Sequence, residues 1–147
     1  MPRRRRPSRK SSPTILIIAG IALLLVGIFA FKSAGDTSGP GALLETQLDR
    51  ALHEGRPAVV FLHSLNCVAC KEMMQTVADV YPDYQDSIAL IDVDVYDQGN
   101  NNLIRREQLQ SIPTLVFYDE RGARQVFIGA MPSGQFRDTL AQLAAGN

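Results

Sequence analysis

The sequence of 147 residues contains no tryptophan, only two histidines and only two cysteines. It also contains no Asn-x-Ser/Thr sequon, so we expect no N-linked glycosylation. Because Cys67 and Cys70 are the only cysteines, any cysteine chemistry must come from this one pair, in the stretch FLHSLNCVACKEMM at residues 61–74. The pair can be a redox centre, half of a metal site or a structural disulfide.

Acidic residues are absent from residues 1–32, which hold seven of the 15 Lys and Arg residues. The other eight basic residues and all 15 Asp and Glu residues follow, so residues 33–147 carry a formal net charge of about −7. A domain with this charge lacks the basic face that nucleic acid requires. We therefore expect no nucleic-acid partner, and the basic residues 1–13 need another explanation.

Charged residues are also absent from residues 14–31, which read TILIIAGIALLLVGIFAF. As a helix this segment would span about 27 Å, close to the hydrocarbon thickness of a bilayer. The positive charge before it predicts that residues 1–13 form a cytoplasmic tail. A cleaved signal peptide is the alternative, with its nearest candidate cleavage site at residues 33–35, but its apolar region is usually shorter. We expect an uncleaved, single-pass anchor in the cytoplasmic membrane, with the cysteines on the periplasmic side.

Residues 32–41 are rich in Gly, Ser and Pro and predict a flexible linker, which leaves residues 42–147 as the exported domain. Apolar periodicity in this domain predicts helices over residues 42–53, 67–80, 100–109 and 133–145, and strands over residues 58–62, 88–95, 114–118 and 125–128. The initial strand–helix–strand implies a parallel pair, whereas the turn at residues 119–122 implies an antiparallel hairpin. The prediction is an α/β domain with a mixed four-stranded sheet flanked by helices.

This order of elements, with a C-x-x-C pair after the first strand, resembles the thioredoxin fold. Lys71 directly follows the second cysteine, as it commonly does in that family. The segment Ser111-Ile112-Pro113-Thr114 looks like the family's Ile-Pro-Thr segment, where the proline is cis and faces the active site. Gly129-Ala130 and Ser133-Gly134-Gln135 look like its closing segment. The resemblance covers about residues 42–145 and implies a thiol:disulfide oxidoreductase that needs no cofactor and no metal.

The two cysteines are expected to have different roles. Cys67 opens a helix, where unpaired N–H groups and the helix dipole favour a thiolate, so Cys67 should attack the substrate. Cys70 lies one turn further and should resolve the mixed disulfide. The resemblance implies that cis Pro113 caps the Cys67 side and leaves the backbone of Ile112 to pair with an extended substrate, with Lys71 in a supporting role.

Two positions depart from the family pattern. Asn66 stands where a tryptophan usually precedes the first cysteine, and Phe61 stands six residues before Cys67, where thioredoxins often bury a proton-relaying carboxylate. By strand alternation His63 lies on the same face as Phe61. We hypothesise that His63 partly replaces the missing acid as proton acceptor for Cys70. The alternative is a solvated histidine at the end of a strand.

Other interpretations of the pair stay open at this point. A structural disulfide would close too short a loop to constrain the unfolded chain much. A metal carrier could combine the thiolates with His63, or with both His63 and His53, for zinc, or with Met73 or Met74 for copper(I). Three acids, Asp92, Asp94 and Asp97, resemble a cation-binding cluster, but we interpret them as a solvated strand end.

The hexapeptide Cys-Val-Ala-Cys-Lys-Glu is more similar to the C-terminal thioredoxin domain of the membrane electron-transfer protein DsbD than to cytosolic thioredoxin, whose pair encloses Gly-Pro. This resemblance implies a monomeric, membrane-tethered reductant of oxidised exported proteins, re-reduced by a DsbD/CcdA-like membrane thiol-electron transporter. The same fold acting as an oxidase or isomerase is the first alternative, because the direction depends on the reduction potential. A non-catalytic copper-handling module is the second.

Overall fold

The computed structural model describes residues 40–146 of the chain. The predicted tail (1–13), the predicted transmembrane anchor (14–31) and nearly all of the predicted linker (32–41) lie outside the described residues. In the part of the chain that is described, no helix is both long and apolar enough to cross a bilayer.

Helices and strands follow one another in the predicted order. The helices are α2 (Pro40–His53), α3 (Val68–Val80), α4 (Asn101–Arg106) and α5 (Ser133–Ala144). The strands are β1 (Ala58–His63), β2 (Ala89–Asp94), β3 (Thr114–Tyr118) and β4 (Arg124–Ile128). Two short 3-10 turns, η1 (Tyr81–Asp83) and η2 (Gln98–Asn100), precede β2 and α4.

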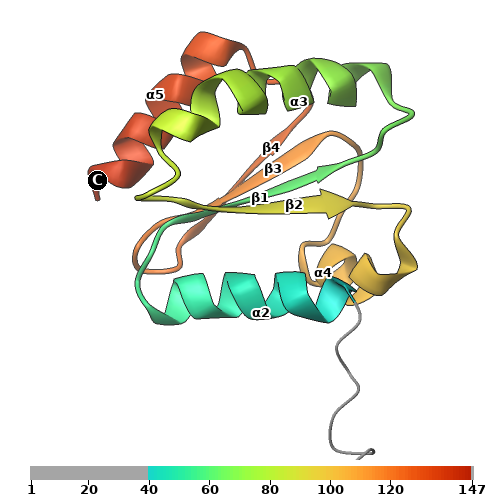
Figure 1. Ribbon diagram of the computed structural model, residues 1–147, viewed down its shortest axis with the longest axis horizontal. Helices are drawn as coiled ribbons and strands as arrows, with labels where there is room; N and C mark the ends of the chain where they lie inside the picture. The colour runs from blue at the N-terminus through green and yellow to red at the C-terminus, as the bar shows by residue number, and fades with distance from the viewer. Residues whose placement is uncertain (1–39, 147) are drawn as a thin grey trace, which may run out of the picture. The chain divides into compact units, whose positions relative to one another are not determined.

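Within the described residues the strands form one mixed sheet with the order β2-β1-β3-β4. β1 and β2 are parallel, whereas β3 is antiparallel to both β1 and β4. Helices α3 and α5 lie over one face of the sheet, and α2 and α4 lie over the other (Figure 1). The predicted mixed four-stranded sheet flanked by helices is therefore confirmed.

The strands bury both faces because each face carries its own layer of helices. Alternate residues of the inner strands belong to two separate apolar clusters, which follows from the period-two geometry of a strand. The cluster on the α3 and α5 side includes Val59, Phe61, Met73, Val77, Leu115, Phe136 and Leu140. The cluster on the α2 and α4 side includes Leu48, Val60, Leu62, Ile91, Val93, Leu103 and Val116. Burial on both faces explains why β1 reads as a continuous apolar run rather than an alternating one.

One predicted helix has different bounds in the structure. The pattern predicts a helix over residues 100–109, but η2 occupies its start and α4 ends at Arg106. Gln108 adopts a left-handed backbone with φ of 53°, and the Leu109 N–H donates to the Ile104 carbonyl at 3.3 Å. This arrangement is a helix C-cap built without glycine, so the sequence carried no stop signal.

β1 and β2 run in the same direction, so the loops that follow them lie together beyond the C-terminal ends of these two strands (Figure 1). The N–H of Val95, just after β2, donates to the carbonyl of His63 at 3.0 Å. β3 begins at this same end of the sheet, because Thr114 is opposite Leu62 in the β1–β3 register. The fold therefore brings the segment before Thr114 and the loop after His63 to the same end of the sheet.

Candidate active site

Cys67 is the N-cap of α3 rather than its first helical residue. Its backbone is extended, with φ of −99° and ψ of 126°, and its Sγ accepts the N–H of Cys70 at 3.2 Å. The preceding turn is closed by the N–H of Asn66, which donates to the Ser64 hydroxyl at 3.2 Å. A sulfur in this position faces the unpaired N–H groups of the first helical turn, which stabilise a negative charge.

Cys70 is fully buried, whereas Cys67 is partly exposed, and both are free thiols in this structure. The pKa of Cys70 is raised to about 11, mainly by burial and also by the hydrogen bond with Cys67, whereas a hydrogen bond with the Ser64 backbone acts in the opposite direction. Cys70 is therefore a protonated thiol at neutral pH. To act as a nucleophile it must lose its proton during the reaction.

His63 is buried, not solvated, so the alternative of a solvated strand-end histidine is wrong. Its ring stacks on Phe61 with centroids 4.6 Å apart, which confirms that the two residues share a face of the sheet. Its Nε2 lies 2.5 Å from Oδ1 of Asp92, and its Nδ1 is buried without a hydrogen-bond partner among the described residues. The ring thus has one nitrogen paired with a carboxylate and one free.

The contact between Asp92 and His63 was not predicted from the sequence, which placed Asp92 in a solvated strand end. The three acids after residue 91 do not form a metal cluster, since no such group of ligands occurs within residues 40–146. Asp94 accepts the N–H of Tyr96 at 3.0 Å, and Asp97 accepts the N–H of Gly99 at 2.9 Å, so both close turns. The strand register, with Phe61 opposite Asp92, places Asp92 on the same face as His63, and its carboxylate reaches the His63 ring.

The Ile112–Pro113 peptide bond is cis, as the family resemblance implies. The Pro113 carbonyl accepts the N–H of Gly129 at 2.8 Å, and the Thr114 hydroxyl donates to the Ser111 carbonyl at 2.7 Å, so the segment is held on both sides. In the described part of the chain, the backbone N–H and C=O of Ile112 have no hydrogen-bond partner. Ile112 is therefore free to pair with an added strand.

Lys71 lies on the exposed side of the first turn of α3. Its backbone N–H donates to the Cys67 carbonyl at 3.1 Å, which is an ordinary helical contact. No ion pair within residues 40–146 involves its side chain. Lys71 can therefore contribute positive charge near the pair, but it does not orient either cysteine through a contact in the structure.

Two of the side chains considered for a copper or zinc site, Met73 and His53, have other places in the fold. Met73 is fully buried, and its sulfur accepts the N–H of Met131 at 3.3 Å. His53 is the last residue of α2, near the N-terminal end of β1, whereas Cys67 follows the C-terminal end of β1. Met73 is thus a core residue, and His53 is at the wrong end of the strands to join a site with the cysteines.

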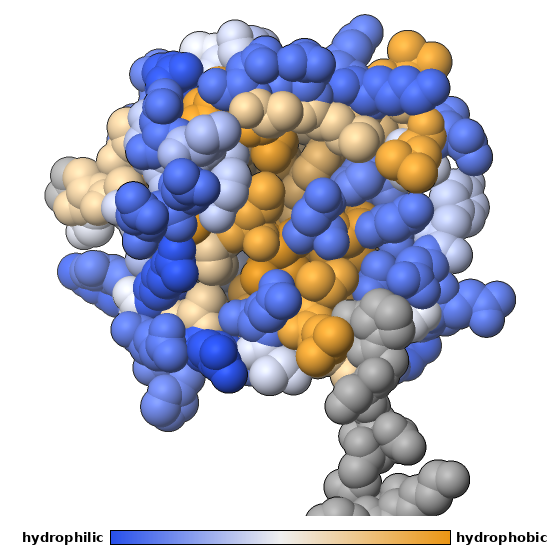
Figure 2. All heavy atoms as spheres, viewed as in Figure 1, coloured by the Kyte–Doolittle hydropathy of each residue, from blue (hydrophilic) through white to orange (hydrophobic). Residues whose placement is uncertain are grey.

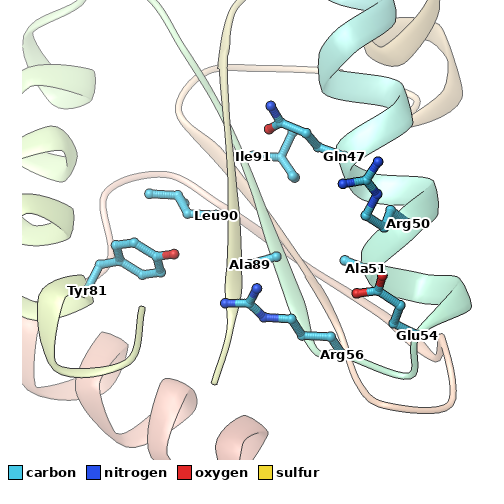
Figure 3. A pocket seen from close by; sticks show the side chains of 9 residues that line it. All are labelled: Gln47, Arg50, Ala51, Glu54, Arg56, Tyr81, Ala89, Leu90 and Ile91. Carbon is cyan, nitrogen blue, oxygen red and sulfur yellow. The ribbon is translucent and has the colours of Figure 1, made fainter. Parts of the chain in front are cut away.

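Two grooves border β2, which is an edge strand. The groove on the α3 side has a volume of about 320 Å³ and is lined mainly by apolar residues of α3, η1 and the sheet, together with Asp92. Figure 2 shows apolar side chains gathered between α3 and α2, over β2. The second groove, of about 270 Å³, lies between α2 and the start of β2 (Figure 3). It is at the opposite end of the strands from the cysteines, so it is not part of the active site.

The fold and the cysteine pair define a redox-type α/β domain, and comparison with known proteins places it more closely. Residues 44–144 match the family model of the thioredoxin-like domain, so the chain belongs to the thioredoxin-like domain family. A search of curated proteins found no match.

Solved thioredoxin structures share the fold. Thioredoxin O2 from Arabidopsis thaliana, in its oxidized state, is 21% identical with a TM-score of 0.62 and covers 71% of this chain and 89% of its own. Chloroplastic thioredoxin z is 20% identical with a TM-score of 0.58, covering 69% and 90%. The germline-specific thioredoxin Deadhead from Drosophila melanogaster is 25% identical with a TM-score of 0.56, covering 67% and 90%. Together with the close cysteine pair, this fold is consistent with a thiol oxidoreductase.

Proposed function

We propose that the protein is a membrane-tethered thiol:disulfide oxidoreductase that reduces disulfides of exported proteins. The observation that carries the proposal is the asymmetry of the pair. Cys67 caps a helix and is partly exposed, whereas Cys70 is buried one turn further along the helix. The backbone N–H of Cys70 donates a hydrogen bond to the Cys67 sulfur. This is the arrangement that an attacking thiolate and a resolving thiol require.

The reaction proceeds in two exchanges. The Cys67 thiolate attacks one sulfur of the substrate disulfide, forming a mixed disulfide and releasing one substrate thiolate. Cys70 then loses its proton and attacks the Cys67 sulfur, so that the mixed disulfide breaks and a Cys67–Cys70 disulfide forms as the second substrate thiolate leaves. His63, the buried base candidate beside the pair in sequence, accepts the Cys70 proton in this proposal. Two electrons pass from the pair to the substrate.

The loop at Ile112 and Pro113 supports a mode of substrate binding. The unpaired backbone of Ile112 can add an extended substrate segment, and Pro113 presents no N–H that would compete with it. Exposed apolar side chains of Leu65 and Val68, 58% and 75% accessible, flank Cys67 and suit an unfolded or partly unfolded protein substrate.

Two sequence features support the proposed location and partner. Residues 14–31 are long and apolar enough for an anchor, and the basic residues 1–13 favour a cytoplasmic N-terminus. A pair held in an oxidising compartment must be re-reduced after each turnover, so we propose a DsbD/CcdA-like membrane thiol-electron transporter as the donor. A tether raises the effective concentration of such a membrane-bound partner.

The first prediction tests the proposed reaction with the purified chain and insulin as the disulfide substrate. Cys67→Ser should lower the reduction rate by at least about 100-fold, because the remaining thiol, Cys70, is buried and protonated at neutral pH. Asn66→Ser is the matched control, since it changes the exposed neighbour and should leave the rate within about twofold. Undiminished reduction by Cys67→Ser would overturn the proposal.

The direction of electron flow is decided by the reduction potential of the pair, measured against glutathione. A value near −270 mV, as in thioredoxin, supports a reductant, whereas a value near −120 mV supports an oxidase. Tight copper binding by the reduced pair, without insulin reduction, would favour the copper-handling alternative.

A further inference from the structure

Asp92 and His63 form a side-chain pair between neighbouring parallel strands. In the β1–β2 register Phe61 is opposite Asp92 and His63 is opposite Asp94, so these side chains share the face that α3 covers. The His63 side chain is only 6% exposed, whereas that of Asp92 is 62% exposed. The pair therefore joins a buried ring to a carboxylate in contact with solvent.

The chemistry of the pair fixes which ring nitrogen carries the hydrogen. An ionised carboxylate only accepts hydrogen bonds, so Nε2 of His63 must donate to Oδ1 of Asp92 across their separation of 2.5 Å. In the neutral ring Nδ1 then holds a lone pair. This nitrogen is buried and has no partner in the part of the chain that the structure describes, so the ring keeps a free base inside the protein.

The elements packed around this face hold few other groups that titrate. Asp94 is on the same strand as Asp92, but its carboxylate accepts the N–H of Tyr96. The N-cap and the first turn of α3 carry the thiols of Cys67 and Cys70, and the next charged residues of the helix, Lys71 and Glu72, are exposed. The backbone of Ser64, the residue after His63, is hydrogen-bonded to Cys70 and accepts the Cys67 N–H at 3.4 Å. His63 thus belongs to the segment that contacts both cysteines.

We propose that Asp92 is a positioning residue for the thiol exchange, acting through His63. This inference rests on the proposed function. Asp92 holds the Nε2–H tautomer so that Nδ1 takes the proton of Cys70 as that sulfur attacks the Cys67 sulfur of the mixed disulfide. The S–S bond to the substrate breaks, the Cys67–Cys70 bond forms, and the leaving thiolate carries the electron pair. The carboxylate stabilises the imidazolium that results.

The groove on the α3 side provides the exit for the proton. It is lined by both Phe61 and Asp92, and it opens to solvent beside β2. The imidazolium can release its Nε2 proton through the exposed Asp92 carboxylate to water, and the ring, which then holds the Cys70 proton on Nδ1, returns to the Nε2–H tautomer by proton exchange with water before the next turnover. The proton of the buried Cys70 thiol would thereby reach solvent through the side chains of His63 and Asp92. Phe61 fills the position where the family often has an acid.

The experiment separates the two exchanges by stopped flow, using the reduced full chain in detergent and an aromatic disulfide reagent whose thiolate absorbs visible light. The first thiolate is released when Cys67 attacks, and the second when Cys70 attacks. Asp92→Asn should leave the first phase unchanged and slow the second about tenfold near neutral pH, with its acid limb moved to lower pH because the base is weaker. Asp92→Glu should restore most of the rate.

Asp94→Asn is the matched control, since it removes the same charge two residues away on the same strand and face. It should leave the second phase within about twofold of the original rate. An equal slowing by Asp94→Asn would assign the effect to charge alone and overturn the inference, as would an unchanged pH profile in Asp92→Asn. If the cysteine exchange itself is absent, the proposed function fails instead, and the two failures are distinct.

Nitrogen NMR of the unaltered chain gives a second readout that does not depend on a folded variant. With only two histidines, His53 serves as the internal reference for His63. The inference expects His63 to be protonated on Nε2 when neutral. Protonation on Nδ1 instead would overturn it.

Discussion

Cys67 and Cys70 differ in environment although only two residues separate them. Cys67 is at the end of the helix where backbone N–H groups are unpaired, whereas Cys70 is already inside the core. One helical turn moves a side chain about 5 Å along the axis, enough to pass from surface to interior here. The division of roles between attack and resolution therefore follows from the position of the helix start.

The second prediction concerns the alkaline titration of the reduced chain. The pKa of Cys70 is raised to about 11, so one thiol should stay protonated until about that pH, as measured by ultraviolet thiolate absorbance. Cys70→Ser should lose this late step. Complete ionisation of both thiols below about pH 9 would contradict the burial argument.

The raised pKa also sets a direction for stability. The unfolded chain releases the Cys70 proton near its ordinary value of 9.0, but the folded chain keeps it up to about 11. The folded state therefore binds more protons between these values, and the contribution of Cys70 to stability falls as the pH rises through this window. Below about pH 9 the contribution is fully present.

At the scale of elements, one buried acid connects α4 with the β3–β4 hairpin. The Glu107 side chain is fully buried just after α4, and both of its oxygens accept the Tyr118 hydroxyl, at 2.9 and 2.8 Å. Arg124 donates from Nε to the same carboxylate at 3.3 Å and from Nη2 to the Glu107 carbonyl at 2.7 Å. The pKa of Tyr118 is raised to about 12, mainly by burial and also by the hydrogen bond with Glu107 and its charge. This network fixes the start of the loop that leads to Pro113.

The third prediction is that Glu107→Gln lowers the free energy of unfolding by about 1–3 kcal/mol, because it removes the buried charge that Arg124 and Tyr118 face. Urea denaturation measures the change. Glu120→Gln, on the exposed hairpin turn, is the control and should change stability by less than about 0.5 kcal/mol. Equal effects of the two substitutions would show that the network does not stabilise this end of the domain.

At the scale of the whole molecule, the proposed anchor and the described domain do separate jobs. Among the described residues, apolar clusters cover both faces of the sheet, and residues 44–144 match the family model. Because the family match begins only at residue 44, we expect the thiol chemistry to need none of residues 1–31. Their proposed role is to hold the reactive pair near a membrane-bound electron donor.

The fourth prediction tests that role by fractionating cells that express the chain. The full chain should sediment with membranes and resist extraction at alkaline pH, because an apolar helix of this length inserts stably. A variant lacking residues 1–31 should remain soluble and reduce insulin at an unchanged rate. Extraction of the full chain by salt alone would contradict the anchor.

The sequence by itself determined the fold class and the cysteine pair, because each depends on local signals, whereas the cis form of Pro113 was implied by the family resemblance. Apolar periodicity predicted every strand, and the C-x-x-C spacing placed both thiols on the first turn of a helix. The end of α4 was missed because Gln108 adopts a left-handed backbone that its residue type does not indicate.

Only the tertiary structure decided which distant residues support the pair. Asp92 is 29 residues from His63, and their contact depends on the parallel register of two strands, in which a shift by one residue would turn Asp92 to the opposite face. Glu107 was equally invisible, because its burial depends on how α4 packs against the hairpin. Local sequence places the two reactive sulfurs at the start of one helix, but the positions of the Asp92 and Glu107 carboxylates depend on how distant parts of the chain pack together.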